Sequence, residues 1–462
     1  MPFGMNPRFV NVIGLGFGFM FTFTAFQTMG IIEQTILDSV KEEDSSFTGD
    51  GFTSLAIVYA VFSLSNWFVP SVIAVIGPNV SMVIGGVFYA HFIVSFLWPS
   101  NAWLYIASVL VGLGAAVIWT GQGNYLTIMS EPENMSRNSG IFWAQLQCSL
   151  LFGNLFVYFM FRDDTTIPKD TRTVVLIVLA VVCGVGVLIL ALLNCAPKYG
   201  FDESGHRRET PASNEVPVTP MGALKGAFDL FLTPQMLLLS VTFFYTGIEL
   251  SFFSGVYSTC VGNTLRLPNS KGLVGMSGMI TGVGEIIGGG TFGIAGKATT
   301  RHGRDPVVML GFLCHVLAFF LVFLNLPNDA VFGNTDAAAF IDSNEYLALF
   351  CSFMLGFGDA CFNTQVYSII GDLYRNQSSA GFALFKFMQS LSAAICFFYS
   401  NHIPLYYQLL ILVIFAVLGT VAFWRVELGL RRSAASVEIT PRNDTSCAAP
   451  VENGDAEKKA SE

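Results

Sequence analysis

Long apolar runs alternate with short polar segments along almost the whole chain. A helix needs roughly 20 mostly apolar residues to cross a lipid bilayer. The sequence holds a series of runs of about that length. The pattern therefore predicts an all-α polytopic membrane protein with twelve transmembrane helices. The predicted helices cover residues 9–34, 52–76, 80–98, 102–129, 139–161, 173–194, 235–259, 272–296, 306–326, 345–371, 380–401 and 406–425.

One long polar stretch divides this series into six helices and six helices. It covers residues 196–220 and is rich in Pro, Ser and Glu. We therefore expect four parts along the chain, since a polar segment of this length reads as a linker. They are an N-terminal six-helix bundle (1–194), a cytoplasmic linker (195–233), a C-terminal six-helix bundle (234–425) and a disordered cytoplasmic tail (426–462).

Composition narrows the class of protein further. Hydrophobic residues make up 53% of the 462 residues, and charged residues only 12%, whereas soluble domains carry about 25% charged residues. This excludes a disordered chain, a nucleic-acid-binding module and an ordinary soluble enzyme. The sequence has no HExxH, GxSxG or P-loop motif, and its nine cysteines include no CxxC pair. We therefore predict no enzyme activity, no catalytic residue, no metal site and no cofactor.

Basic residues predict the orientation in the membrane. Most of the 23 lysines and arginines fall on one side if both termini are cytoplasmic, as the positive-inside rule requires. The glycosylation sequons at Asn79, Asn134, Asn376 and Asn443 would then all face the cytoplasm, so we expect none of them to carry a glycan. The sequence does not separate the plasma membrane from endosomal membranes.

Glycine spacing indicates an internal repeat. Gly77 and Gly85 flank the turn after the second predicted helix, and Gly303 and Gly311 flank the turn after the eighth. Matching positions in two halves of a membrane protein are typical of duplicated bundles. The spacing therefore favours two pseudo-symmetric halves in parallel arrangement.

The loop after the eighth predicted helix carries a recognisable motif. It reads Arg301-His302-Gly303-Arg304-Asp305-Pro306 and resembles the loop signature of the major facilitator superfamily. The resemblance implies two six-helix bundles that rock about a central cavity, with Arg301, Gly303 and Arg304 in a cytoplasmic gating loop. Thr300 stands where the superfamily usually has an acidic residue. The simpler alternative is that both arginines only obey the positive-inside rule.

A second resemblance covers residues from about 9 to 425. Six segments in order are similar to the Unc-93-like branch of that superfamily. Members of this branch are known or suspected as regulatory subunits of potassium channels and as escorts of Toll-like receptors, so the resemblance does not by itself imply transport. The segments are Ala25-Phe26-Gln27-Thr28, Trp119-Thr120-Gly121-Gln122-Gly123-Asn124, Arg137-Asn138-Ser139-Gly140-Ile141-Phe142-Trp143, Phe253-Ser254-Gly255-Val256-Tyr257, Gly284-Glu285-Ile286-Ile287-Gly288-Gly289 and Gly358-Asp359-Ala360-Cys361-Phe362-Asn363-Thr364-Gln365.

Polar groups inside the predicted helices are the candidates for a site. An ionisable side chain within the bilayer costs several kcal/mol unless it is shielded. In the superfamily arrangement these groups fall on the helices that line or flank the cavity. We therefore predict a solute or ion cavity lined by Gln27, Gln122, Asn124, Gln147, Glu249, Asp359, Asn363 and Lys386.

The intramembrane charges predict a link to protons. The predicted helices hold one lysine, Lys386, and three carboxylates, those of Glu249, Glu285 and Asp359, which cannot all be ionised cheaply. One carboxylate is expected to pair with the lysine, and the other two to hold a proton part of the time. A carboxylate that exchanges a proton as access alternates would couple transport to protons.

Several of these residues also have a purely structural interpretation. Glu249 could be a buried carboxyl bonded to a neighbouring helix. Glu285 shares a stripe with Gly278, Gly282 and Gly289, and such spacing lets helix backbones approach closely. For Glu285 the packing role is favoured. Trp143 is expected to serve in core packing, and His91 and His315 in ordinary hydrogen bonds.

Two functions follow from this reading. The first is a secondary transporter that moves a small solute by alternating access, with or without coupled protons. The second is a regulatory subunit or trafficking escort of another membrane protein. The predicted partners are the lipid bilayer, an unknown small solute or proton, or another membrane protein, and no nucleic acid.

Overall fold

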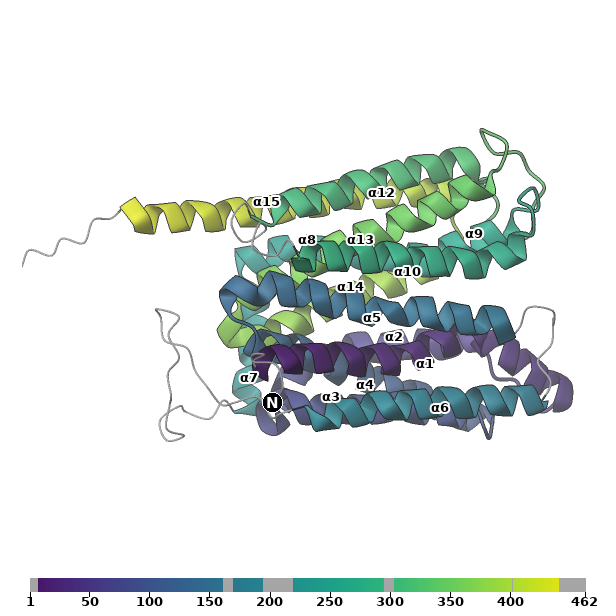
Figure 1. The fold of residues 1–462 in the computed structure, drawn as a ribbon, viewed down its shortest axis with the longest axis horizontal. Helices are drawn as coiled ribbons and strands as arrows, with labels where there is room; N and C mark the ends of the chain where they lie inside the picture. The colour runs from purple at the N-terminus through teal and green to yellow at the C-terminus, as the bar shows by residue number, and fades with distance from the viewer. Residues whose placement is uncertain (1–6, 161–168, 194–218, 295–302, 401, 440–462) are drawn as a thin grey trace, which may run out of the picture.

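The computed structural model describes residues 7–160, 169–193, 219–294, 303–400 and 402–439. The elements in these residues are helices, apart from one isolated β-bridge between Thr264 and Thr335. The helices run roughly side by side, and the first and last described residues lie at the same end of the bundle (Figure 1). We call this end the termini end. Which compartment it faces stays a prediction.

The first half of the chain contains six described helices. They are α1 (Pro7–Glu43), α2 (Gly51–Ser65), α3 (Val69–Ser95), α4 (Asn101–Met129), α5 (Pro132–Met160) and α6 (Lys169–Leu192). Polar caps start several of them, as helix N-termini require. Asp50 accepts a hydrogen bond from the Thr53 amide before α2, and Ser100 accepts one from the Trp103 amide before α4.

The second half begins with a short helix that lies within the predicted linker. Its elements are α7 (Pro220–Phe231), α8 (Pro234–Ser251), the π-helix η1 (Phe252–Tyr257), α9 (Ser258–Asn263), α10 (Ser270–Ile294), α12 (Asp305–Asn325), α13 (Glu345–Leu373), the 3₁₀ turn η2 (Arg375–Gln377), α14 (Ser378–Ser400) and α15 (Leu405–Ile439). The helix α7 lies inside the predicted linker. The predicted disorder of the tail is wrong over residues 426–439, because α15 continues past residue 425 to Ile439. Residues 440–462 of the predicted tail lie outside the described part of the chain.

Ten described helical segments are long and apolar enough to cross a membrane. The chain is thus an integral multi-pass membrane protein, but the predicted count of twelve is not confirmed. The helix α2 has only 15 residues. It ends at Ser65, and the remainder of the predicted span 52–76 belongs to α3. The helix α5 is long, but its first half carries Arg137, Asn138 and other polar residues.

Gly77 marks the turn within α3. Its φ of 79° is a left-handed conformation that favours glycine, and Pro78 follows it. The chain bends there, and α3 consists of two helical parts. This turn is the one that the sequence predicts between the second and third helices.

The two halves repeat the same helix contacts. In the first half, α1 packs on α5 and α6, α3 packs on α4 and α6, and α2 packs on α4. In the second half, α8 packs on α14 and α15, α12 packs on α13 and α15, and α10 packs on α13. Each pair corresponds to its counterpart in chain order. Figure 1 shows the halves as two layers that meet where α5 lies beside α10.

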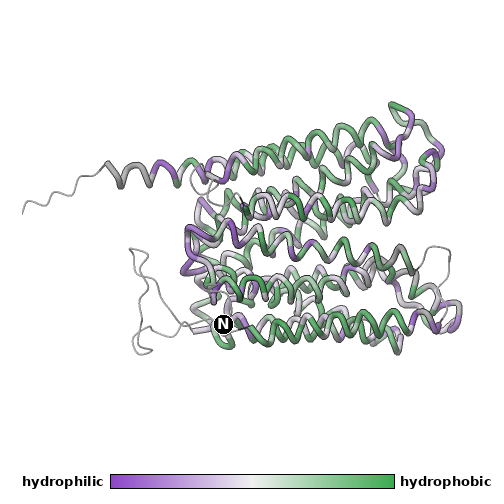
Figure 2. Tube along the Cα trace, in the orientation of Figure 1, coloured by the Kyte–Doolittle hydropathy of each residue, from purple (hydrophilic) through white to green (hydrophobic). Residues whose placement is uncertain are grey.

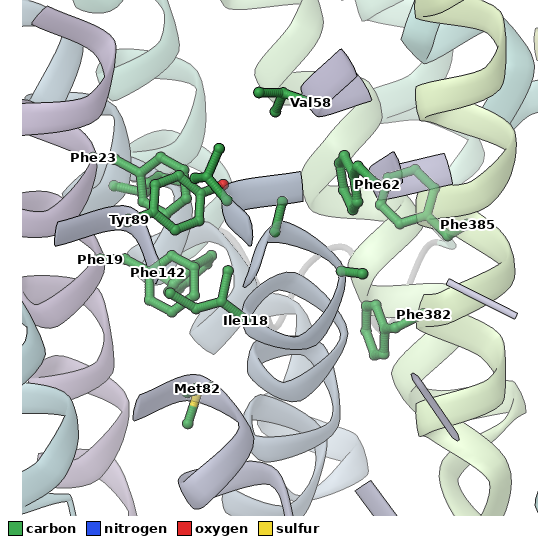
Figure 3. Packing of buried hydrophobic residues seen from close by; sticks show 14 of the residues in the cluster. Phe19, Phe23, Val58, Phe62, Met82, Tyr89, Ile118, Phe142, Phe382 and Phe385 are labelled. Carbon is green, nitrogen blue, oxygen red and sulfur yellow. The ribbon is translucent and has the colours of Figure 1, made fainter. Parts of the chain in front are cut away.

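The halves meet through two equivalent pairs, α5 with α10 and α2 with α14. The larger core cluster extends across this boundary (Figure 3), with Phe62 of α2 on the same side of the core as Phe382 and Phe385 of α14. Outer helices present apolar side chains such as Leu188 and Leu313. Hydrophilic residues concentrate toward the two ends of the bundle (Figure 2). This distribution suits a protein that lies in a lipid bilayer.

Candidate functional site

Three carboxyl groups meet inside the second half. Glu249 of α8, Glu285 of α10 and Asp359 of α13 are each at most 1% exposed. The carboxyl group of Asp359 lies against those of Glu249 and Glu285. Carboxyl groups in such close contact cannot all be ionised without strong repulsion. The cluster therefore carries fewer negative charges than it has carboxyl groups.

Lys386 of α14 is joined to this cluster by two amide side chains. Its Nζ donates to Gln389 Oε1 at 2.8 Å. Gln389 Nε2 donates to Asn363 Oδ1 at 3.4 Å, and Asn363 Nδ2 donates to Asp359 Oδ1 at 2.6 Å. The ion pairs of the described residues do not include Lys386. The predicted direct pair with a carboxylate is therefore wrong in this conformation, because the amide relay lies between the charges.

Aromatic rings surround the lysine ammonium. Nζ of Lys386 lies 4.4 Å from the ring centre of Trp119, 4.6 Å from that of Phe385 and 5.6 Å from that of Tyr367. A cation over aromatic faces is attracted by their negative electrostatic potential. Trp119 belongs to α4 in the first half, so the ammonium sits at the boundary between the halves. We call these three rings the ring cage.

A tryptophan of the first half also reaches the carboxyl cluster. Trp143 Nε1 in α5 donates to Glu285 Oε2 at 2.6 Å, and the amide of Gln147 also lies next to Glu285. The expectation that Trp143 serves only in packing was incomplete. Both tryptophans come from segments that carry the family resemblance.

The glycine stripe of α10 lies against α5. A Cβ on Gly278 would come within 2.6 Å of the Asn154 side chain, and one on Gly289 within 2.8 Å of the Ala144 backbone nitrogen. Gly282 lies similarly close to Leu150. This close contact is what brings Glu285 within reach of Trp143.

His315 of α12 belongs to the cluster, which the sequence analysis missed. Its Nδ1 lies 2.5 Å from the Tyr245 hydroxyl, and its Nε2 lies 3.3 Å from Glu249 Oε1 and 3.1 Å from the Leu355 carbonyl. The geometry fits a neutral imidazole that accepts from the tyrosine and donates through Nε2. The only signal in the sequence was one histidine in the middle of an apolar run.

Two of the predicted cavity residues, Gln27 and Asn124, bond to partners outside the carboxyl cluster and the amide relay. Gln27 accepts a hydrogen bond from Ser149 at 2.6 Å, which joins α1 to α5. Asn124 donates to Ser378 at 2.8 Å, which joins α4 to α14. Gln122 and Asn363 are buried. Because the central polar groups are shut off from solvent, the predicted cavity is closed in this conformation.

The termini end is closed by contacts between the halves that the sequence analysis missed. Arg375 donates to the carbonyl of Ser130 at 2.7 Å, at the C-terminal end of α4, where a cation is favourable. Met135 of α5 packs so tightly on Gly371 of α13 that a Cβ there would lie 2.3 Å from the methionine Cε. Together with the Asn124–Ser378 bond, these contacts hold α4 and α5 against α13 and α14.

The predicted gating loop contacts its own half where it is described. Arg301 lies outside the described residues. Gly303 has a φ of 91°, and a Cβ there would overlap the Arg431 guanidinium. Arg304 donates to Ser368 Oγ at 2.9 Å and forms ion pairs with Asp372 of α13 and Glu427 of α15.

Arg304 therefore fastens helices within the second half. Burial lowers the pKa of its guanidinium, and the neighbouring Glu427 carboxylate opposes that shift. An arginine whose pKa starts so high keeps its charge near neutral pH. Separately, no group of three or more His, Cys, Asp and Glu side chains within the described ranges could hold a metal ion.

Comparison with known proteins now assigns the family. A family model described as "Ion channel regulatory protein UNC-93" matches residues 44–424. The chain belongs to the UNC-93 family. The UNC93-like protein MFSD11 of Xenopus laevis is 46% identical over 92% of this chain and 98% of its own length. Human protein unc-93 homolog A is 25% identical over 92% of this chain and 94% of its own length. The predicted resemblance to the Unc-93-like branch is confirmed.

Two solved transporter structures share the fold of this UNC-93 family member. The E. coli fucose:proton symporter FucP matches with a TM-score of 0.61 at 11% identity, over 90% of this chain and 98% of that chain. A bacterial homologue of the iron transporter ferroportin, in an outward-facing state, matches with a TM-score of 0.62 at 14% identity over the same shares. These identities show the fold alone, and the predicted all-α fold of the major facilitator type is confirmed.

Proposed function

We propose that this protein is a secondary transporter that moves a small solute by alternating access and couples it to protons. The observation that carries the proposal is the buried carboxyl cluster that touches the opposite half. A structural core has no need of three carboxyl groups and a lysine, because each buried charge is unfavourable in a membrane. A transporter needs groups of this kind at the boundary between its moving halves.

The geometry supports a specific form of coupling. Glu285 lies against Asp359 within its own half and accepts a hydrogen bond from Trp143 of the other half. A further proton on the cluster removes a negative charge, so the acceptor strength of Glu285 toward the indole changes. Proton occupancy is thereby transmitted to a contact between the halves. The fold neighbours support the same function, since one is a proton symporter by its title.

A regulatory role is the alternative, and the family model favours it. Its description names an ion channel regulator, so a subunit that binds a channel or receptor without moving a solute fits this family. Such a protein would need one stable arrangement of its halves. A transporter must populate two arrangements, and this difference can be measured.

Spin-label distances test the proposal directly. Glu133 starts α5 and Asn376 follows α13, and both are exposed at the termini end on opposite halves. Glu133→Cys and Asn376→Cys would be labelled after the native cysteines are replaced by serine. We expect two distance populations whose ratio changes between about pH 5 and pH 8, with Asp359→Asn removing most of that change.

A control pair within one half secures the interpretation. Labels at Glu133 and Val80, both exposed in the first half, should give one distance at every pH. One unchanging distance for the cross-half pair as well, in lipid nanodiscs and in detergent, would overturn transport. It would support the regulatory alternative.

A further inference from the structure

Building on the proposed function, we infer that its solute is an organic monoanion with an apolar body, and that one proton enters with each anion. The anionic group would bind the Lys386 ammonium, and the body would lie among the rings of the cage. The observations behind this inference are where each charge faces, which polar atoms lack partners, and how the charges balance.

The positive charge faces the boundary between the halves, and the negative charge does not. The Lys386 ammonium lies against Trp119 of the first half. Asp359 is surrounded by Glu249, Glu285 and Asn363 of its own half. A solute that enters between rocking halves therefore meets the ammonium first, and reaches Asp359 only past the amide relay.

Polar atoms without partners lie beside the ring cage. Neither amide atom of Gln122 has a hydrogen-bond partner within the described part of the chain, although the residue is fully buried. The hydroxyl of Tyr367 is also buried without a partner there. Buried polar groups in native proteins are nearly always hydrogen-bonded. Gln122 lies one turn from Trp119 on the same face of α4, and the Tyr367 ring belongs to the cage, so both can bond to a ligand held there.

The charge balance favours one proton for each anion. The lysine charge and the Asp359 carboxylate offset each other through the relay. An anion that replaces Gln389 at the ammonium neutralises the lysine and leaves the carboxylate charge uncompensated in a low-dielectric site. The cluster then takes up one proton. An organic cation in the same place would instead lie directly against the ammonium, which is unfavourable at short range.

Several titratable groups face Asp359 and set the pH at which it takes up this proton. Those against Asp359 are Glu249 and Tyr245 from α8, Glu285 from α10 and Lys386 from α14. His315 from α12 reaches the cluster through Glu249. Because His315 is placed as a neutral hydrogen-bonding group, the added proton is expected on the carboxyl cluster.

Three aromatic probes of similar size test the inference on the full-length purified protein. They are benzoate, benzamide and benzylammonium, which share a ring and differ in charge. We expect benzoate alone to raise the thermal unfolding midpoint, because a ligand that binds only the native state stabilises it. Its apparent affinity should fall roughly tenfold for each pH unit above the range in which the cluster takes up this proton.

Two charge-removing variants separate the roles of the charges. Lys386→Gln should lose benzoate binding, whereas Lys386→Arg should keep it. Asp359→Asn should keep binding and lose its pH dependence, since the variant no longer has a charge to neutralise. Glu33→Gln, a change at a buried carboxyl of the first half, is the matched control and should behave as wild type.

Other outcomes overturn the inference. These are stabilisation by benzamide or benzylammonium in place of benzoate, no stabilisation by any of the three, or equal loss of binding in Asp359→Asn and Lys386→Gln. This failure is distinct from failure of the proposed function. Spin-label distances that alternate without benzoate binding would refute only the anion, and benzoate binding to a single fixed arrangement would refute only transport.

Discussion

The indole nitrogen of Trp143 in α5 lies 2.6 Å from a carboxyl oxygen of Glu285 in α10. This buried hydrogen bond joins the two halves of the protein at the carboxyl cluster. It is possible because glycines of α10 let α5 approach closely. The contact therefore depends on two features of the sequence, the glycine stripe of α10 and the Glu285 carboxyl group.

Removal of this hydrogen bond should loosen the contact between the halves. Trp143→Phe keeps an aromatic ring but leaves the Glu285 oxygen without its donor. A buried group that loses a hydrogen bond destabilises a protein by about 1–3 kcal/mol. We expect a lower unfolding midpoint and a larger population with separated labels at Glu133 and Asn376.

The control is Trp98→Phe, because Trp98 is mostly exposed. It should change neither the unfolding midpoint nor the label distances. If Trp143→Phe leaves both measurements at wild-type values, the hydrogen bond does not hold the halves together.

The close approach of α5 and α10 predicts a strong effect of one methyl group. A Cβ on Gly140 would lie 2.4 Å from the backbone nitrogen of Gly293. Backbone atoms cannot turn aside as a flexible side chain can, so Gly140→Ala should destabilise the protein by about 1–3 kcal/mol. The comparison is Gly184→Ala in α6, where nothing lies within 4 Å, and alanine favours the helix.

Both variants would be followed by thermal unfolding in detergent. Gly184→Ala should unfold at or slightly above the wild-type midpoint, and Gly140→Ala clearly below it. Equal midpoints for the two variants would contradict the tight α5–α10 contact.

Arg375 should hold the termini end closed. Its bonds to the Ser130 and Thr127 carbonyls join the halves, and Arg375→Gln shortens the side chain out of reach. Buried Met135, replaced by cysteine, would report the opening through its reaction with a polar maleimide. We expect several-fold faster labelling of Met135→Cys in the Arg375→Gln background.

Wild type supplies the background labelling of the nine native cysteines. Arg266→Gln is a suitable charge control, since Arg266 is exposed and its Nε donates to the loop carbonyl of Asp336. An unchanged labelling rate in Arg375→Gln would show that other contacts keep this end closed.

Much of the fold could be predicted from the sequence because apolar length is a local signal. A run of about 20 apolar residues dictates a helix wherever the bilayer denies water to the backbone. The errors came where tertiary contacts decide. The break after Ser65 splits one predicted span between α2 and α3, and α15 continues beyond the predicted end at residue 425 to Ile439.

The site was predicted in part, for the same reason. Asp359 and Asn363 are four residues apart on one helix, and their hydrogen bond follows from helix geometry. The partners of Glu285 and Lys386 in the first half are far away in sequence, so no local pattern names them. His315 was expected only to make ordinary hydrogen bonds, and it is packing between α12 and α8 that brings it to Glu249.

Glycan mapping tests the predicted orientation. Asn376 is exposed at the termini end, so its sequon should stay unmodified in a eukaryotic host if that end is cytoplasmic. Ala337 is exposed in the loop between α12 and α13 at the opposite end. Ala337→Asn with Ala339→Thr creates a sequon there, which should gain a glycan that an endoglycosidase removes. A glycan on Asn376 would contradict the predicted orientation, since it would place the termini end on the side opposite to the cytoplasm.

The amide relay predicts that Gln389 and Asn363 act as a unit. Lys386 bonds to Gln389, Gln389 bonds to Asn363, and Asn363 bonds to Asp359. Loss of either amide therefore breaks the connection between the lysine and the carboxyl cluster. Gln389→Leu and Asn363→Leu should each lower stability by about 1–3 kcal/mol. The double variant should lower stability by less than the sum of the two single changes, with a coupling energy of about 0.5–3 kcal/mol.

The control is Gln408→Leu, at a buried glutamine that bonds to backbone carbonyls elsewhere. Its loss of stability should add independently to that of either variant. Strict additivity of Gln389→Leu and Asn363→Leu in unfolding measurements would mean that the lysine and the carboxyl cluster are held separately, and that no relay connects them.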